Sequence, residues 1–183
     1  MVRKRLQPDF RLEVVAKEYM IRKLTPADAP EFMRLRRESF RKAPLSFEQT
    51  GDIILQPSVI LEQLRITDHQ FVLGYFSKTG RLSGIMALNR YEPVKRRHRS
   101  YLWGVYLSEE VRGQGIAKQL LSEIIAEARA MEGLERIILT VSNHAEGALK
   151  LYKKAGFTEF GREPGAARTG DIQMDEIYML LDL

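Results

Sequence analysis

Apolar residues recur along this chain at two spacings, one typical of helices and one typical of strands. Every third or fourth position between residues 117 and 131 is apolar, which predicts an amphipathic helix. A second helix is predicted from Thr25, an N-cap residue, with Pro26 in its first turn and an acidic residue at position 28. Two shorter helices are expected at residues 55–66 and 147–155, the latter ended by Gly156.

Runs of apolar, β-branched and aromatic residues predict the strands. Ser77–Gly80 has the composition of a hairpin turn between the first two runs. Residues 44–51 are rich in turn formers and predict a loop. The expected strands cover residues 71–76, 81–91, 101–107, 136–141 and 176–181, and residues 157–160 are expected to begin a further strand.

A glycine-containing loop, residues 112–117, separates the strand at 101–107 from the helix at 117–131. The first amides of a helix have no carbonyl partner and carry the positive end of the helix dipole, so phosphate oxygens bind there. Gly113 and Gly115 would let a diphosphate reach the backbone and would tolerate a tight loop. The pattern therefore predicts a binding site for a polyanion.

Spacing argues against two common phosphate-binding loops. A P-loop requires Lys followed by Ser or Thr after its last glycine, whereas Gly115 is followed by Ile, Ala, Lys and Gln. A dinucleotide-binding loop would have Gly or Ala where Lys118 stands, and an acidic residue after the next strand. That strand ends instead in Ser142-Asn143. Glycine loops of this kind also bind coenzyme A, and these two mismatches leave that ligand class open.

The sequence Arg-x-x-Gly-x-Ala at 112–117, followed downstream by Leu-Tyr-Lys-Lys-Ala-Gly-Phe at 151–157, resembles the GNAT superfamily of acetyl-CoA-dependent N-acyltransferases. The first motif is similar to the family's pyrophosphate loop and the second to its Leu-Tyr-x-x-x-Gly-Phe helix end. The resemblance covers residues 20–183. It implies a single α/β (α+β) domain with a mixed, mostly antiparallel central sheet of about six to seven strands, splayed at the cofactor site and flanked by about four helices. Residues 1–19 match nothing and form an extension of unknown role.

The resemblance also implies residue roles. Tyr152 would be the general acid that reprotonates the leaving thiolate, because a phenol with a pKa of about 10 stays protonated at neutral pH. Asn143 is a further candidate cofactor contact, although many relatives carry asparagine where this chain has Ala145. Backbone groups of the preceding strand would pair with the pantetheine arm, and those of the loop would hold the pyrophosphate: Val105, Tyr106, Leu107, then Arg112, Gly113, Gln114, Gly115, Ile116, Ala117 and Lys118.

The implied activity is transfer of the acetyl group from acetyl-CoA to a primary amine of a small molecule or peptide, by direct attack in a ternary complex. The alternative is a non-catalytic acetyl-CoA-binding sensor with the same fold. The strand at 101–107 lacks an acidic residue, so the general base is left open among Glu92, His98, Asp175, Glu176 and ordered water. Polyamines, aminoglycosides, amino acids and protein amines all remain possible acceptors.

Composition narrows the class of protein. With 183 residues, 44% hydrophobic and 29% charged, the chain suits one soluble domain. It contains no cysteine, which excludes disulfides and a thiol nucleophile, and its three histidines lack ligand spacing, so no metal site is expected. No long apolar run or signal core is present in the sequence, which predicts a cytoplasmic protein without a membrane partner.

The net charge of +5 and the basic run at residues 95–99 raise the question of nucleic-acid binding. The run lies between two predicted strands, which favours a solvated connection over a nucleic-acid surface. Such charge would also attract anionic CoA over a distance. Pairing of two copies through the C-terminal strands is a further expectation for this fold.

Overall fold

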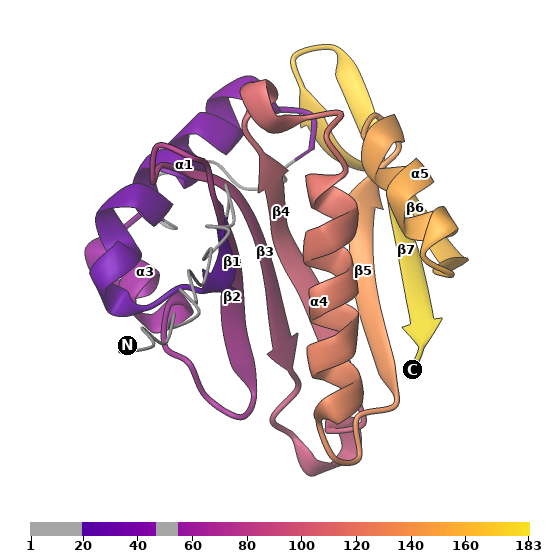
Figure 1. Ribbon diagram of the computed structural model, residues 1–183. Helices are drawn as coiled ribbons and strands as arrows, with labels where there is room; N and C mark the ends of the chain where they lie inside the picture. The colour runs from indigo at the N-terminus through magenta and orange to yellow at the C-terminus, as the bar shows by residue number, and fades with distance from the viewer. Residues whose placement is uncertain (1–19, 47–54) are drawn as a thin grey trace, which may run out of the picture.

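The computed structural model describes residues 20–46 and 55–183. The extension at 1–19 and much of the loop expected at 44–51 lie outside these residues. Within them the chain forms seven strands and four helices (Figure 1). The strands are β1 (Met20–Lys23), β2 (Gln70–Phe76), β3 (Leu82–Arg90), β4 (Arg99–Leu107), β5 (Arg136–Ser142), β6 (Thr158–Thr169) and β7 (Ile172–Asp182). The helices are α1 (Ala29–Lys42), α3 (Pro57–Gln63), α4 (Ile116–Ala130) and α5 (Glu146–Lys154).

All strands belong to one sheet with the order β1-β2-β3-β4-β5-β7-β6. Neighbouring strands are antiparallel except β4 and β5, which are parallel and joined by the crossover helix α4. The mixed, mostly antiparallel sheet expected from the sequence is therefore confirmed. Among the described residues no helix is long and apolar enough to cross a bilayer.

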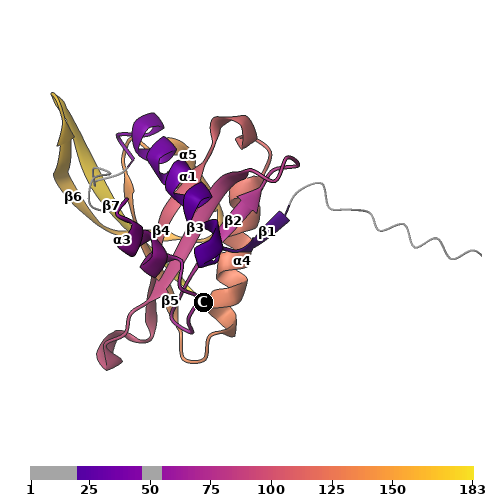
Figure 2. The same ribbon diagram turned by 90° about the vertical axis from the view of Figure 1, so that its left-hand side faces the viewer.

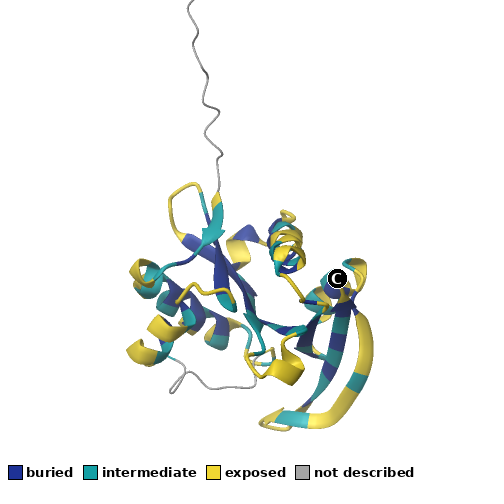
Figure 3. Cartoon of the chain, turned by 90° about the horizontal axis from the view of Figure 1, so that it is seen from below, coloured by how far each residue is buried: buried dark blue, intermediate teal, exposed yellow. Residues whose placement is uncertain are grey.

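The sheet lies between two apolar cores, so its central strands are buried on both faces. Phe71 and Leu73 of β2 pack in the core under α4 and α5, whereas Val72 packs in the core under α1 and α3. Figure 2 shows α1 and α3 on one side of the sheet and α4 on the other. In Figure 3 the dark blue of buried residues is concentrated on the strands between these helices.

Strands β4 and β5 diverge along their length, as expected for a splayed sheet. Their register holds only from Arg99↔Arg136 to Tyr101↔Ile138. Beyond Tyr101, β4 continues beside β3 and β5 continues beside β7. The second half of β4 therefore has no strand partner on its β5 side.

A β-bulge bends β4 beside this opening. Ile85 pairs with Tyr106 and Ala87 with Trp103, so two β4 residues lie opposite Met86 alone. One of them is Gly104, with φ of 64°, a conformation that side chains other than glycine's rarely adopt. A single glycine inside an apolar strand pattern is a known sign of a bulge.

Two elements differ from the sequence prediction, and a third was predicted only at its beginning. The strand expected to begin at 157–160 is β6, which continues to Thr169 because Pro164 can remain in an edge strand that pairs only with β7. Its register shifts between Glu159 and Gly161 and between Glu163 and Ala167, where turn formers interrupt the ladder. Strand β7 correspondingly begins at Ile172 instead of 176, and the short β1 was not predicted.

The other boundaries agree within a few residues. The helix expected at 55–66 is confirmed but begins at Pro57, a residue that fits the first helical turn. Thr25 precedes a short 3₁₀ turn, Pro26–Asp28, before α1 begins. Gly156 follows α5 with φ of 97°, as expected for a residue that ends a helix.

Candidate active site

An open cleft of about 1460 Å³ lies where β4 and β5 diverge. Its walls are residues 101–107 of β4, residues 140–142 of β5, the loop before α4, and the facing sides of α4 and α5. The C-terminal half of α1 and part of the β6–β7 hairpin also line it. The cleft therefore joins the predicted cofactor residues to Asp175 and Glu176, two of the candidate bases, and to α1, which the sequence did not connect with them.

Most of the predicted site residues line this cleft, but two do not. The side chain of Gln114 folds back, with Nε2 donating to the carbonyl oxygen of Glu110 at 2.9 Å. The Oδ1 atom of Asn143 accepts the backbone N–H of Asp175 at 2.9 Å, which joins β5 to β7. The lining residues are Val105, Tyr106, Leu107, Arg112, Gly113, Gly115, Ile116, Ala117, Lys118 and Tyr152.

The loop before α4 leaves its backbone accessible. Gly113 and Gly115 have φ of 74° and 79°, and Gly115 is the N-cap residue of α4. A Cβ atom added at either glycine would meet nothing within 4 Å. The space over the loop is thus open to a ligand, beside the amides that α4 leaves without carbonyl partners.

Arg112 fastens this loop to the end of β4. Its Nε donates to the carbonyl oxygen of Leu107 at 3.0 Å, and its guanidinium lies 5.5 Å from the ring centroid of Tyr106. Further basic side chains line the cleft from α4 and α5, and together they suit a ligand with several phosphates. These are Lys118 and Arg129 of α4 and Lys150 and Lys154 of α5.

Tyr152 lies in α5 with 4% of its surface exposed, at the wall of the cleft. Its ring packs 5.7 Å from that of Phe157, centroid to centroid. Burial, and to a lesser degree the nearby Tyr101, raises the pKa of the Tyr152 phenol well above its usual range. The phenol is therefore protonated at neutral pH and can donate a proton.

A hydroxyl pair spans the two strands just where their backbone pairing ends. The Oη of Tyr101 and the Oγ1 of Thr140 are 2.7 Å apart. Burial raises the pKa of Tyr101, more than the hydrogen bond to Thr140 lowers it. This hydrogen bond therefore lies at the end of the cleft where β4 and β5 are still paired.

The candidate general bases are separated by the fold. Glu176 and Asp175 line the cleft, whereas Glu92 lines a second, smaller cavity and His98 lines neither. The Asp175 carboxylate accepts the Gly165 N–H at 2.9 Å and lies 3.5 Å from Arg162. Glu176 is the second acidic candidate that lines the cleft, and its charge contributes to the raised pKa of Tyr101.

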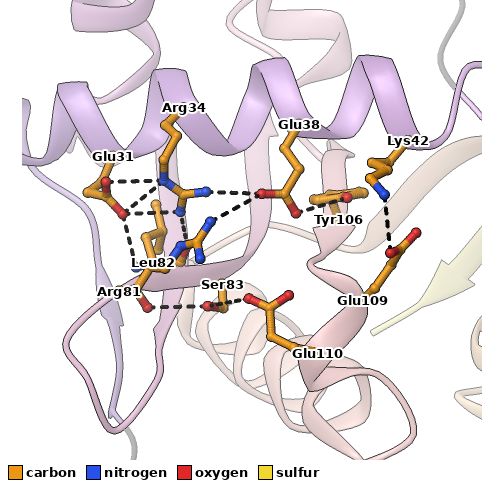
Figure 4. Close-up of polar contacts among 10 residues, drawn as sticks. All are labelled: Glu31, Arg34, Glu38, Lys42, Arg81, Leu82, Ser83, Tyr106, Glu109 and Glu110. Atoms are coloured by element: carbon orange, nitrogen blue, oxygen red, sulfur yellow. Dashed lines mark hydrogen bonds and ion pairs between the residues drawn. The ribbon is translucent and has the colours of Figure 1, made fainter.

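A polar network holds α1 against β3 and β4 (Figure 4). Tyr106 donates to Glu38 Oε1 at 3.2 Å, and Arg34 lies 3.0 Å from the other oxygen of Glu38. Arg34 also donates to the carbonyl oxygen of Leu82, and Lys42 lies 3.4 Å from Glu109. Desolvation opposes ionisation of Glu38, but hydrogen bonds from Ser108 and Tyr106 and the arginines keep its pKa below the usual range.

The sequence analysis did not single out Arg36, which lines the cleft from α1. It is 4% exposed, and its guanidinium lies 4.7 Å from the ring centroid of Phe40 and 5.9 Å from that of Trp103. The available signal was its spacing, because Phe32, Arg36 and Phe40 lie four residues apart on one helix face.

Comparison with known proteins finds a family model and several solved structures that this chain resembles. The family model described as "Acetyltransferase (GNAT) family" matches residues 29–157. A Streptococcus pneumoniae acetyltransferase of the GNAT family is 27% identical, with a TM-score of 0.81 over 91% of this chain and 100% of that one. A Salmonella typhimurium structure titled yncA with its cofactor acetyl-CoA has a TM-score of 0.76 and 19% identity, over 90% and 94% of the two chains. At that identity the second likeness concerns the fold alone.

Curated relatives match shorter stretches. An L-methionine sulfoximine/L-methionine sulfone acetyltransferase of Pseudomonas aeruginosa is 25% identical over 57% of this chain and 60% of its own length. Others match at 35–37% identity over 68–71 residues, which is less than half of their length.

Proposed function

The chain belongs to the GNAT acetyltransferase family, and on that premise we propose that it is an N-acetyltransferase that moves the acetyl group of acetyl-CoA to a primary amine of a small molecule or peptide. One observation carries the proposal: the splayed strands, the glycine loop and a buried, protonated tyrosine line the same cleft.

The glycine loop and the unpaired half of β4 suit two different parts of acetyl-CoA, its pyrophosphate and its pantetheine arm. The pyrophosphate would accept hydrogen bonds from the amides between Arg112 and Lys118, where the glycines leave the backbone open. The pantetheine arm carries amide groups, which can pair with Val105, Tyr106 and Leu107 on the side of β4 that lacks a strand partner. The cofactor would thus occupy the place of a missing strand.

The proposed reaction is a direct attack. The amine nitrogen bonds to the thioester carbon, the carbon–sulfur bond breaks, and the Tyr152 phenol donates its proton to the departing thiolate. The second proton that the nitrogen loses as it becomes an amide returns through water to Tyr152 and restores the phenol. The acceptor ammonium first loses a proton to Glu176, directly or through water. Holding the two substrates together supplies much of the rate, since the thioester is already activated.

Tyr152→Phe tests this proposal. We expect at least about a 100-fold fall in kcat, the lower end of the range for a proton-transfer group, with less than about a threefold change in the affinity for acetyl-CoA. CoA release from acetyl-CoA in the presence of an amine panel measures kcat, and calorimetry measures the affinity. The absence of cysteine keeps the background of a thiol reagent low.

Tyr178→Phe is the matched control, because that phenol bonds Glu163 on the exposed hairpin and does not line the cleft. Unchanged turnover in Tyr152→Phe would remove the tyrosine from the mechanism. Retained turnover in Glu176→Gln would leave water as the base. Tight acetyl-CoA binding without release for any amine would favour the sensor.

A homodimer through the C-terminal strands and a cytoplasmic location remain predictions.

A further inference from the structure

We propose that the hydroxyl groups of Tyr101 and Thr140 form a relay that carries a proton from the acceptor ammonium to Glu176. The inference rests on the proposed acetyl transfer, and it adds two residues that take part in the reaction. The path of the proton crosses three strands of the sheet, from β4 through β5 to β7.

The three side chains of the relay lie on the same face of the sheet. Side chains alternate between the two faces along a strand. The neighbours of Thr140 and Glu176 along β5 and β7 pack in the core under α4 and α5: Leu139, Val141 and Ile177. Thr140 and Glu176 therefore point to the opposite face, and Tyr101 points there too because its hydroxyl contacts that of Thr140. All three residues line the cleft.

Glu176 lies within reach of Thr140. In the antiparallel register of β5 and β7, Thr140 pairs with Tyr178 and Ser142 pairs with Glu176, so Glu176 is the diagonal neighbour of Thr140. Diagonal neighbours on one face have Cα atoms about 7–8 Å apart, a gap that a long side chain can bridge directly or with one water. Burial and, to a smaller degree, the charge of Glu176 raise the pKa of Tyr101, which agrees with a carboxylate close to this phenol.

Tyr101 lies near the point where the reacting groups would meet. With the phosphates on the loop at 112–118, the pantetheine arm would run back along β4 towards Gly104. The thioester would then lie close to the end of the cleft where β4 and β5 are still paired. Tyr101 is the last β4 residue in that pairing. After burial, it is also the second cause of the raised pKa of the Tyr152 phenol, so the two phenols lie near each other.

The Tyr101 hydroxyl keeps an acceptor site for an ammonium group. Its oxygen lies 2.7 Å from the Oγ1 atom of Thr140, and either atom can donate in this bond. A phenol oxygen has one proton and two lone pairs, and the backbone of Thr140, which also hydrogen-bonds to this oxygen, occupies one lone pair. When Tyr101 donates its proton to Thr140, the other lone pair can accept an N–H of the acceptor.

The relay moves one proton and leaves both hydroxyl groups unchanged. An N–H proton of the ammonium passes to the Tyr101 oxygen, the phenol proton moves to Thr140 Oγ1, and the hydroxyl proton of Thr140 moves to Glu176, directly or through one water. A carboxylate has about four acceptor sites, so Glu176 can take this proton beside its other contacts. The neutral amine then attacks the thioester, and Glu176 releases the proton to solvent.

The titratable and charged groups around Tyr101 come from several elements. They are Glu176 of β7, Tyr152 of α5 and Tyr91, which follows β3, while Arg36 lines the same cleft from α1. Glu176 is the carboxylate of this set, so it is the group that accepts a proton at neutral pH. The raised pKa of Tyr101 keeps its phenol protonated, as a relay requires.

The pH dependence of kcat/KM tests the relay, with the amine that releases CoA fastest in the panel. The wild type deprotonates bound ammonium, so its kcat/KM should change by less than about threefold from the pKa of the amine to two pH units below it. In Tyr101→Phe and Thr140→Val only neutral amine reacts. Their kcat/KM should fall about tenfold for each pH unit below that pKa, and should approach the wild-type value above it.

Two control variants separate the relay from packing. Thr140→Ser keeps the hydroxyl and should follow the wild-type profile. Tyr91→Phe removes a phenol that lines the second cavity and not the cleft, and it keeps the ring that contacts Arg96 and Arg99. It should also follow the wild type. Calorimetry should give each variant an affinity for acetyl-CoA within about threefold of the wild type.

Combining Tyr101→Phe with Glu176→Gln tests where the relay ends. Because both changes break the same path, the double variant should have a kcat/KM no lower than that of the weaker single variant. Additive losses would overturn the assignment of Glu176 as the last group of the relay.

The relay and the acetyl transfer can fail separately. If the wild type releases CoA but Tyr101→Phe and Thr140→Val lose the same factor at every pH, or lose nothing, the transfer holds and the relay is overturned. If no amine releases CoA from the wild type, the proposed transfer is overturned and the relay with it.

Discussion

Gly115 combines a left-handed backbone with open space above it, and these two properties can be tested separately. Alanine at this position adds backbone strain of about 1 kcal/mol and places a methyl group where a pyrophosphate would lie. We expect Gly115→Ala to weaken acetyl-CoA binding about tenfold or more. Calorimetry of the variant measures this change.

Gly170→Ala is the matched control for strain. Gly170 has φ of 58° with nothing within 4 Å of an added Cβ, but it lies in the turn between β6 and β7. Both variants should lose a similar free energy of unfolding, and only Gly115→Ala should lose affinity. Equal affinities would mean that the loop backbone does not contact the cofactor.

At the residue scale, sequence reasoning selected candidates whose pattern is local. The glycine loop and Tyr152, which line the same cleft, were selected because short motifs carry both the spacing and the residue types. Arg36 was missed because charged residues alternate with apolar ones along α1, and an arginine there is usually solvated. Its burial depends on Trp103 and Phe40, and the contact with Trp103 arises only when the helix packs on the sheet.

At the element scale, the turn that begins α1 predicts a dependence of stability on pH. Asp28 accepts hydrogen bonds from Arg22 at 2.7 and 2.8 Å and from the backbone of Thr25 at 2.8 Å. The bond from Arg22 is the largest cause that lowers the pKa of Asp28 to about 2, against about 3.9 in an unfolded chain. The carboxylate therefore contributes stability that is fully present above pH 4 and is lost as the pH falls through 2.

Asp28→Asn should cost about 1–2 kcal/mol of unfolding free energy at pH 7, a value reduced for the partial exposure of Arg22. The difference from the wild type should shrink between pH 4 and pH 2, as measured by urea unfolding. Asp182→Asn breaks a more exposed pair with Arg136 and should change stability by less than about 0.5 kcal/mol. A constant Asp28 effect across this range would contradict the proposed linkage.

Elements differ in how far local sequence determines them. Helix α4 follows its apolar period almost residue for residue, because one stripe of it faces one core. Strand β6 does not, since Pro164 and the glycines around it predict an interruption that the edge position accommodates. The register between β4 and β5 depends on α4 bringing distant segments together, and no local pattern records it.

At the scale of the whole molecule, the basic side chains that line the cleft predict a dependence on salt. They include Lys118, Arg129, Lys150 and Lys154. We expect KM for acetyl-CoA to rise several-fold between about 50 and 500 mM salt, because ions screen this attraction. Steady-state kinetics with an uncharged amine as acceptor measures the effect.

S-Acetylpantetheine, which lacks the phosphates, is the control donor. Its KM should change little over the same range of salt. A similar rise for both donors would show that salt acts on the acceptor or on the fold and not on the phosphates.

A sheet that opens in its middle has four edges instead of two. The outer edges are β1 and β6, and the inner ones are the second halves of β4 and β5. A strand edge presents a row of unpaired backbone N–H and C=O groups, which can form hydrogen bonds with peptide-like amides whatever side chains the strand carries. In the proposed cofactor site, the contacts of β4 with the pantetheine arm are therefore made by backbone groups. We expect the side chains of this stretch of β4 to vary freely over evolution, whereas the loop glycines should not vary.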